Sequence, residues 1–290
     1  MSATPAGGTL WSDAWRRLRR NRMAVASGLT LIVIVLTCAL APWLPGLADP
    51  NAPNFELGVG GPSWGHPLGT DLLGRDMLAR TIYGGRISIL VGLVGTLVSI
   101  LIGVSYGAIS AYRGGKTDEV MMRLVDILYA LPYIFLVILL LVFFSKSLIM
   151  LFVALGAVQW LTMARIVRGQ VLSLKNQAFV EAARALGARE SRIIFGHIVP
   201  NTLGPVIVYS TLTIPAIILQ EAFLSFLGLG VQPPDASWGV LVSEGAQMLA
   251  FFPWLTIFPG LALAATLFAF NFVGDGLRDA LDPHDRKVAG

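Results

Sequence analysis

Charged residues are scarce in this 290-residue sequence: they make up 13% of it, whereas 55% of the residues are hydrophobic. Soluble domains carry about 25% charged residues, so this chain has too few charges to cover a water-facing surface. The apolar content also excludes an intrinsically disordered chain. The net charge of +4 gives no basic footprint for nucleic acid. We therefore expect an all-α, polytopic membrane protein.

Cysteine and histidine are almost absent as well. The single cysteine, Cys38, lies in an apolar run and has no partner for an intrachain disulfide. The histidines His66, His197 and His284 have no second His, Cys or carboxylate at ligand spacing on a shared helix face. We therefore expect neither a disulfide framework nor a metal site.

Two glycine-containing motifs fall short of nucleotide-binding signatures. The run RGGKT at 113–117 has Ser110 where a phosphate-binding loop requires glycine, and the run LGLG at 227–230 is followed by Pro233 where a dinucleotide fingerprint requires glycine. We expect no catalytic residue and no cofactor in this chain.

Six apolar segments have about the length that a helix needs to cross the hydrocarbon core. They are residues 24–44, 87–112, 124–144, 147–163, 203–227 and 251–274. Only Ser145 and Lys146 separate the third segment from the fourth, so these two are predicted to form a tight helical hairpin. The first segment could alternatively be a cleaved signal peptide with Ala39-Leu40-Ala41 at the cleavage site, but its apolar run exceeds the usual length.

The distribution of Lys and Arg predicts the orientation, because cytoplasmic loops carry an excess of both. With a cytoplasmic N-terminus, only Arg75, Arg80, Arg86 and Lys146 fall outside. The other seventeen fall inside: Arg16, Arg17, Arg19, Arg20, Arg22, Arg113, Lys116, Arg123, Arg165, Arg168, Lys175, Arg184, Arg189, Arg192, Arg278, Arg286 and Lys287. We therefore expect both termini in the cytoplasm and the basic N-terminal residues against anionic membrane lipid.

The second span carries a small residue at every fourth position: Gly95, Ser99, Gly103, Gly107 and Ala111. Such a face lets another helix approach closely, either within the chain or from another subunit.

A long segment between the fourth and fifth spans, residues 165–200, is predicted to lie in the cytoplasm and to be functional, because packed helices need only short connections. Asn176 is predicted to cap a helix whose apolar face contains Phe179, Ala182, Ala183 and Leu186. Gly187 suits a C-terminal cap with positive φ. A second short helix is predicted to start at Ser191, to contain Ile193, Ile194 and Ile198, and to end before Pro200.

This segment contains a specific combination of residues: Glu181-Ala182-Ala183, then Gly187 after three residues, then Ile198-Val199-Pro200-Asn201 after ten more. It resembles the EAA-loop signature of permease subunits in binding-protein-dependent ABC importers, although Val199 stands where the signature usually has leucine. Five further stretches resemble the C-type permease of dipeptide, oligopeptide and nickel importers. They are HPLGTD at 66–71, GRD at 74–76, IYGGRIS at 82–88, EAFLSFLGLG at 221–230 and NFVGDGLRDALDP at 271–283.

The resemblance implies a type I ABC importer permease fold with six transmembrane helices and cytoplasmic coupling helices, in the bacterial inner membrane. Its implied partners are a homologous B-type permease, two ATPase subunits that hold ATP and Mg, and an external substrate-binding protein. The sequence then divides into a basic tail at 1–23, a first transmembrane helix at 24–44, an external loop at 45–86, a permease core at 87–275 that includes the EAA loop at 165–201, and a cytoplasmic tail at 276–290.

The resemblance assigns ATPase coupling to Glu181, Ala182, Ala183, Gly187, Ile198 and Pro200. Glu221 is an ionisable residue within a span, which indicates either a pathway or gate position or a hydrogen bond that fixes its helix. Asp126 is predicted to pair with Arg123, and Trp238 to anchor the external 228–250 segment at the membrane interface.

An ion-gradient-driven secondary transporter is the main alternative, but it predicts a coupling-ion site and inverted repeats, and the sequence shows neither clearly. A signalling or scaffold membrane protein would have neither transport activity nor ATPase partners.

Overall fold

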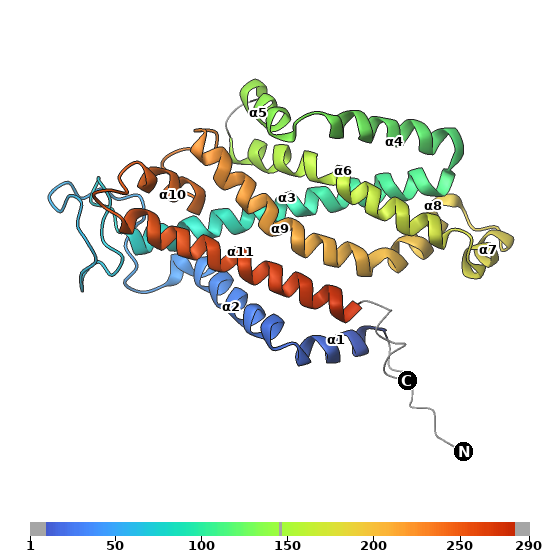
Figure 1. Ribbon diagram of the computed structural model, residues 1–290, viewed down its shortest axis with the longest axis horizontal. Coiled ribbons are helices and arrows are strands. Elements are labelled where there is room, and N and C mark those ends of the chain that lie inside the picture. Colours follow the sequence, from blue (N-terminus) through green and yellow to red (C-terminus); the bar gives the residue numbers. More distant parts are fainter. Residues whose placement is uncertain (1–9, 145–146, 282–290) are drawn as a thin grey trace, which may run out of the picture.

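The computed structural model describes residues 10–144 and 147–281, which form an elongated helical bundle (Figure 1). Its elements are α1 (Leu10–Arg20), α2 (Arg22–Ala39), η1 (Ala41–Trp43), α3 (Met77–Arg113), α4 (Gly115–Ala130), α5 (Tyr133–Phe144), α6 (Leu148–Leu174), α7 (Ala178–Ala185), α8 (Glu190–Ile193), η2 (Ile194–Ile198), η3 (Val199–Thr202), α9 (Leu203–Phe226), α10 (Trp238–Ala246) and α11 (Trp254–Leu281). Within these ranges, five helical segments are long and apolar enough to cross a membrane, and there are six if α4 and α5 form one bent span.

Polar side chains define where several helices begin. The main-chain N–H groups of Ala24 and Ala79 donate to the side chains of Asn21 and Asp76 at the starts of α2 and α3. The hydroxyl of Ser237 accepts from the N–H of Val240 at the start of α10. Each side chain satisfies an N–H group that has no partner within the helix.

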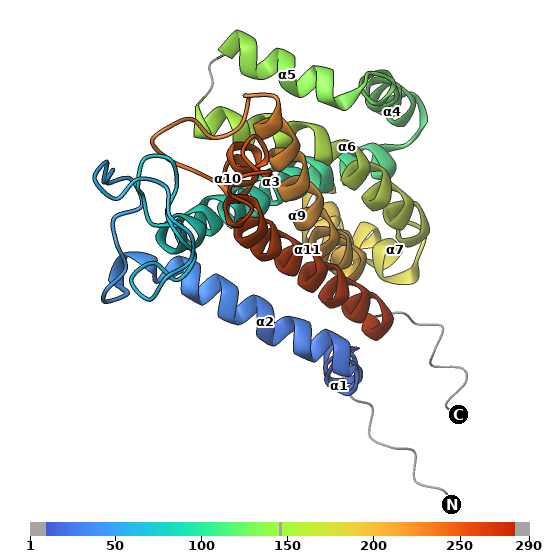
Figure 2. The same cartoon turned by 60° about the vertical axis from the view of Figure 1, so that its left-hand side comes forward.

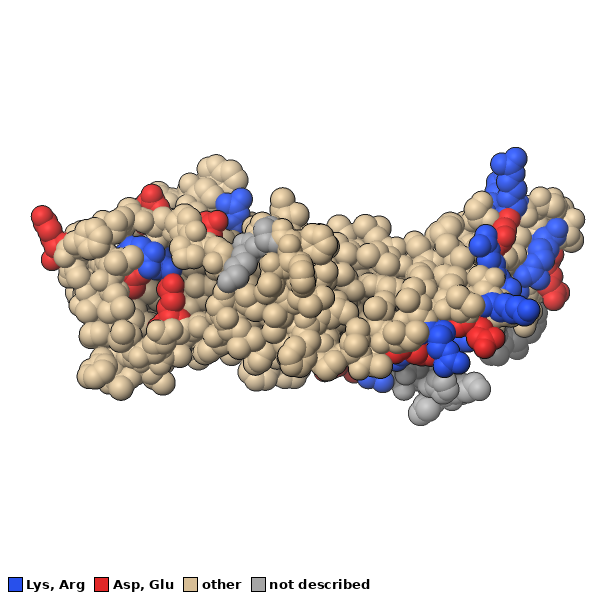
Figure 3. All heavy atoms as spheres, turned by 90° about the horizontal axis from the view of Figure 1, so that it is seen from above, with Lys and Arg blue, Asp and Glu red and all other residues tan. Residues whose placement is uncertain are grey.

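On the face seen in Figure 3, charged side chains lie towards the two ends and leave a broad uncharged belt across the middle. Lys and Arg gather at the end that carries α7, and the first described helix and the end of α11 lie towards that same end (Figure 1). The belt is what a chain embedded in a bilayer presents to lipid.

The third span differs from its prediction. A single helix over 124–144 was expected, whereas α4 and α5 meet at an angle of 87° (Figure 2). The prediction was wrong because Pro132 has no N–H to donate to Leu128 and disfavours helical backbone at Leu131. The predicted hairpin between the third and fourth spans is present as packing of α5 on α6, through Val137, Leu141 and their neighbours; residues 145 and 146 lie outside the described ranges.

Three other helices extend beyond the predicted spans. α3 begins at Met77, ten residues inside the predicted external loop; α6 continues to Leu174, and α11 to Leu281. Hydropathy detects only the apolar part of a helix, whereas the hydrogen-bonded backbone continues into water.

The end opposite α7 is more ordered than a pair of irregular loops. The predicted 228–250 loop contains α10, and Trp238 is buried rather than anchored at the membrane interface. Its indole N–H donates to the carbonyl of Thr81 at 2.8 Å. Only glycine fits opposite the ring, because a Cβ at Gly85 would clash with Trp238 and with the sulfur of Cys38. Sequence alone could not show the contact between Trp238 and Thr81, since the two residues are 157 positions apart.

Ion pairs join the loop between η1 and α3 to α3 and α10. Asp71 accepts from Arg75 Nε at 2.7 Å and from Arg80 Nη1, and Arg80 Nη2 lies 3.3 Å from Glu244. Arg80 is almost fully buried, so its charge depends on these carboxylates.

Candidate functional site

α7 lies at the basic end of the bundle, in the turn between α6 and α8 (Figure 1). The N–H of Gly187 donates to the carbonyl of Arg184 at 2.9 Å, and the N–H of Ala188 donates to that of Ala183 at 3.1 Å. These two bonds form a Schellman motif. As the sequence predicted, Gly187 has a positive φ, of 77°. The start of α7 differs from the prediction, because Gln177 rather than Asn176 is the N-cap residue, and it makes no side-chain cap hydrogen bond.

Of the four residues predicted for the apolar face of α7, two lie against the bundle and two are exposed. Val180 and Ala183 are buried and Phe179 is partly buried, but Ala182 is exposed and Leu186 is 87% exposed. Periodicity identifies which residues share a face, but it does not show which face the bundle covers. α7 therefore presents an outward strip of small side chains, with a leucine beside it. The strip consists of Ala178, Ala182 and Ala185 at i, i+4 and i+7.

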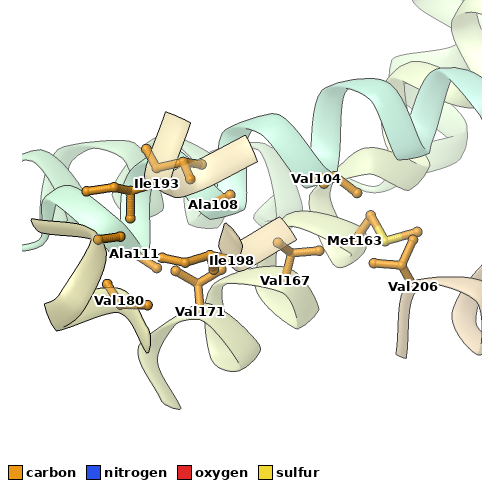
Figure 4. Packing of buried hydrophobic residues seen from close by; sticks show 12 residues of the cluster. Val104, Ala108, Ala111, Met163, Val167, Val171, Val180, Ile193, Ile198 and Val206 are labelled. Atoms are coloured by element: carbon orange, nitrogen blue, oxygen red, sulfur yellow. The ribbon is translucent and has the colours of Figure 1, made fainter. Parts of the chain in front are cut away.

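A hydrophobic cluster beneath α7 fixes its position (Figure 4). Ile193, Ile194 and Ile198, which were predicted to share a short helix, are buried, and Val180 joins them from α7. The remaining members are Val104, Ala108 and Ala111 of α3, Met163, Val167 and Val171 of α6, Ala183 of α7 and Val206 of α9. α7 is thus held on a packed surface.

The second short helix of the 165–200 segment, predicted to run from Ser191 to before Pro200, differs from its prediction. It begins at Glu190, one residue early, and does not end before Pro200, because α8, η2, η3 and α9 form one helical stretch from Glu190 to Phe226. The π-helical turn η2 precedes Pro200, with the N–H of Val199 donating to the carbonyl of Ile194. This wider turn accommodates the proline, and the fifth span connects directly to the α7 region.

Polar contacts also join this region to the end of α3. Lys175 Nζ donates to the carbonyl of Ala111 at 2.9 Å, and Arg113 Nε donates to Glu190 at 2.8 Å. The guanidinium of Arg184 lies 5.2 Å from the ring centre of Tyr112. From the sequence these cations were predicted only to lie in the cytoplasm, and their partners were not predicted. Their positions at helix ends were the available signal.

The small-residue face of α3 lies against helices of the same chain. A Cβ at Gly103 would clash with Met163, and one at Gly107 with the main chain of Ala164, both on α6. Gly95 faces Ile217 of α9, and Ser99 is buried. The face therefore allows close packing within the chain.

Glu221 is completely buried between α9 and α10. One carboxylate oxygen accepts from Ser225 at 2.9 Å and from Ser237 at 2.6 Å. The bond from Ser237 connects the fifth span to α10, whereas Ser225 lies on α9 itself. Asp126, in contrast, pairs with Arg165 at 2.8 Å rather than with the predicted Arg123, because the bundle brings α6 beside α4.

The structure is thus a bundle of helices long and apolar enough to cross a membrane, with the capped helix α7 packed at one end. The chain belongs to the family described as binding-protein-dependent transport system inner membrane component, which matches residues 95–287. Residues 9–56 match the N-terminal transmembrane domain of oligopeptide transport permease C.

Curated relatives match over nearly the whole chain. The oligopeptide transport system permease protein OppC of Haemophilus influenzae is 52% identical, covering 97% of this chain and 90% of the relative. The dipeptide transport system permease protein DppC of Bacillus subtilis is 46% identical, covering 95% and 86%. A glutathione transport system permease protein, GsiD of Pectobacterium atrosepticum, is 38% identical, covering 95% and 91%.

A chain of the MetNI methionine ABC transporter has the same fold, with a TM-score of 0.59 at 18% identity over 71% of this chain and 98% of that one. The predicted fold class and family are thereby confirmed: the chain is an inner-membrane permease subunit of a binding-protein-dependent ABC importer. In this family separate subunits hydrolyse ATP, and nothing favours a secondary transporter. Across residues 10–144 and 147–281, no cluster of three or more His, Cys, Asp or Glu side chains could hold a metal ion.

Proposed function

We propose that this chain forms half of the translocation pathway of a peptide importer, together with a homologous B-type permease. The relatives named above transport oligopeptides, dipeptides and glutathione, which all contain amide-linked residues. No relative named above is a nickel permease, so we retain peptide as the solute. An external binding protein delivers the peptide, and two ATPase subunits drive the transport.

The outward strip of α7 is the observation that supports ATPase coupling. A helix with exposed alanines at i, i+4 and i+7 permits close approach by another protein, and Leu186 supplies an apolar contact at its end. Because α7 is packed on the ends of α3, α6 and α9, a force on this strip reaches three spans. The proposed coupling residues Glu181, Ala182 and Gly187 lie on or beside the strip, and Ala183 and Ile198 are buried beneath it, whereas Pro200 is exposed in η3.

We also propose that the end carrying α7 faces the cytoplasm, with both termini on that side. The concentration of Lys and Arg at this end supports the orientation. Residues 1–23 and 276–290 then form cytoplasmic tails around a core that starts near residue 87; Arg286 and Lys287 lie outside the described residues.

Crosslinking in the assembled importer tests this coupling site. Cys38, the only native cysteine, is buried, so a cysteine introduced at Leu186 supplies the accessible thiol. We expect Leu186→Cys to crosslink to an ATPase subunit and Ser173→Cys, an exposed control on α6, to crosslink far less.

Function is tested with Leu186→Asp, which places a charge in the proposed contact. We expect ATP-dependent peptide uptake to fall at least tenfold while the chain still inserts into the membrane. Normal uptake together with an absence of Leu186→Cys crosslinks would contradict the proposal. Ala183→Arg is unsuitable as a docking test, because that side chain is buried against the bundle.

A further inference from the structure

The break between α4 and α5 places non-helical backbone inside the apolar region. Leu131 and Pro132 separate the two helices, and the bonds that start α5 run back to the carbonyl of Pro132. At membrane depth such backbone is tolerated only where protein buries it or where it lines a water-filled cavity. Discontinuous helices near the bilayer midplane are also where transporters place their solute sites.

A cavity of about 450 Å³ lies at this break, between the α4–α5 bend, α6 and α9. Its polar lining comes from Tyr129, Tyr133, Gln159, Thr162 and Gln220, and none of its described lining residues carries a charge. Gln159 lies eleven residues from the start of α6, which is about 17 Å along the helix. That depth is close to the middle of a hydrocarbon core about 30 Å thick.

Gln220, which lines this cavity, has a hydrogen-bond acceptor that is unpaired within the described part of the chain. Its carbonyl oxygen is buried and has no hydrogen-bond partner among the described residues. A buried acceptor without a donor costs about 1 to 3 kcal/mol. Because Gln220 lines the cavity, a rotation of its side chain would bring this oxygen to an N–H group there.

An ion pair lies about one turn beyond Thr162 on α6, towards the basic end. The guanidinium of Arg165 is 4.2 Å from the ring centre of Tyr129, and its Nη2 donates to Asp126 at 2.8 Å. The two charges neutralise one another at the rim, so the cavity itself offers only neutral hydrogen-bonding groups and aromatic rings.

We infer that this cavity binds the main chain of the peptide as it crosses the membrane, with the amide groups of Gln159 and Gln220 pairing with peptide amides. This inference rests on the proposed function. Neutral amides match the one chemical group that all peptides share, and they do not select for the charge of a peptide side chain. The cavity therefore suits a carrier of peptides of varied sequence.

Uptake by the complete importer in proteoliposomes tests the site, with labelled trialanine as the probe. Gln220→Leu and Gln159→Leu should each lower ATP-dependent uptake about tenfold at equal complex yield. Leucine has nearly the same size as glutamine but has no amide group to pair with the peptide. Gln220→Asn should retain more uptake than Gln220→Leu. Gln170→Leu is the matched control on α6, outside the cavity, and should transport normally.

Accessibility supplies a readout that a structural role would not change. In a Cys38→Ala background, Gln220→Cys should react with a charged, membrane-impermeant thiol reagent during ATP turnover, and trialanine should slow the reaction at least fivefold. Normal uptake by both leucine variants, or no labelling in any state, would overturn the site. A wild-type importer that does not take up trialanine would instead overturn the proposed peptide function, so the two failures are distinguishable.

Discussion

Arg168 donates two hydrogen bonds to Asp118, from Nε at 2.7 Å and from Nη2 at 2.6 Å. Asp118 also accepts from Ser110 at 2.6 Å, so three helices, α3, α4 and α6, meet at one carboxylate. The site lies at the basic end, near the helices that support α7. Because arginine alone presents two parallel N–H groups to a carboxylate, this contact fixes the orientation of α4 as well as its position.

Replacing Arg168 with lysine should therefore destabilise the protein. A lysine keeps the charge but cannot form the paired hydrogen bonds, and we expect a loss of about 1 to 2 kcal/mol. Thermal unfolding of the purified importer measures the effect. Arg165→Lys is the control, because the Arg165–Asp126 pair is more exposed and should lose less than about 1 kcal/mol. Equal losses in both variants would contradict this role for Arg168.

Gly187→Val should weaken the coupling of ATP hydrolysis to uptake. The positive φ of Gly187 is strained for a β-branched residue by about 1 to 3 kcal/mol, although the space around it is open. Gly187→Asn should be nearly normal, because asparagine tolerates this conformation. The measurement is the number of ATP molecules hydrolysed per peptide taken up. An equal increase in that ratio for both variants would show that backbone conformation is not the cause.

Gly107→Ala should destabilise the contact between α3 and α6. The added methyl group would meet the main chain of Ala164, which cannot move aside as a side chain can, and we expect a cost of about 1 to 3 kcal/mol. Gly169→Ala is the matched control: its Cβ would meet no atom within 4 Å, so the better helix propensity of alanine should stabilise α6 by up to about 1 kcal/mol. Thermal unfolding should move in opposite directions, and a shared direction would refute the packing argument.

Glu221→Leu should loosen α10 from α9. Ser237 would lose its acceptor, at a cost of about 1 to 3 kcal/mol, and Ser225 would keep only its bond to the carbonyl of Glu221, whereas Glu221→Gln retains one oxygen that accepts both bonds. Proteolysis of the external 228–250 segment measures the difference. If the leucine variant resists cleavage and transports normally, the bonds are dispensable. If the glutamine variant keeps its fold but loses transport, the acidic group itself has a role in the pathway.

The comparison of prediction with structure is clearest at α7. Residue order along the chain was sufficient for the positive φ of Gly187 and for a helical segment containing Ile193 and Ile198, because both follow from local pattern. It was not sufficient for the direction of Leu186, which depends on how α6 and α9 place the segment.

The same division holds for the cavity at the helix break. Pro132 was visible in the sequence, and its missing N–H was a sign that the third span would not be continuous. The approach of Gln159 and Gln220 to that break was not visible, because they belong to different helices.

The sequence by itself determined the membrane class, the number and order of the apolar spans, the excess of positive charge on one side and the family signature. Each of these depends on composition or on neighbours within a few residues. Only the tertiary structure decided the partners of Asp126, Arg168, Glu221 and Trp238, and the side of α7 that remains exposed. Those contacts join distant parts of the chain, and close packing of helices in three dimensions selects them.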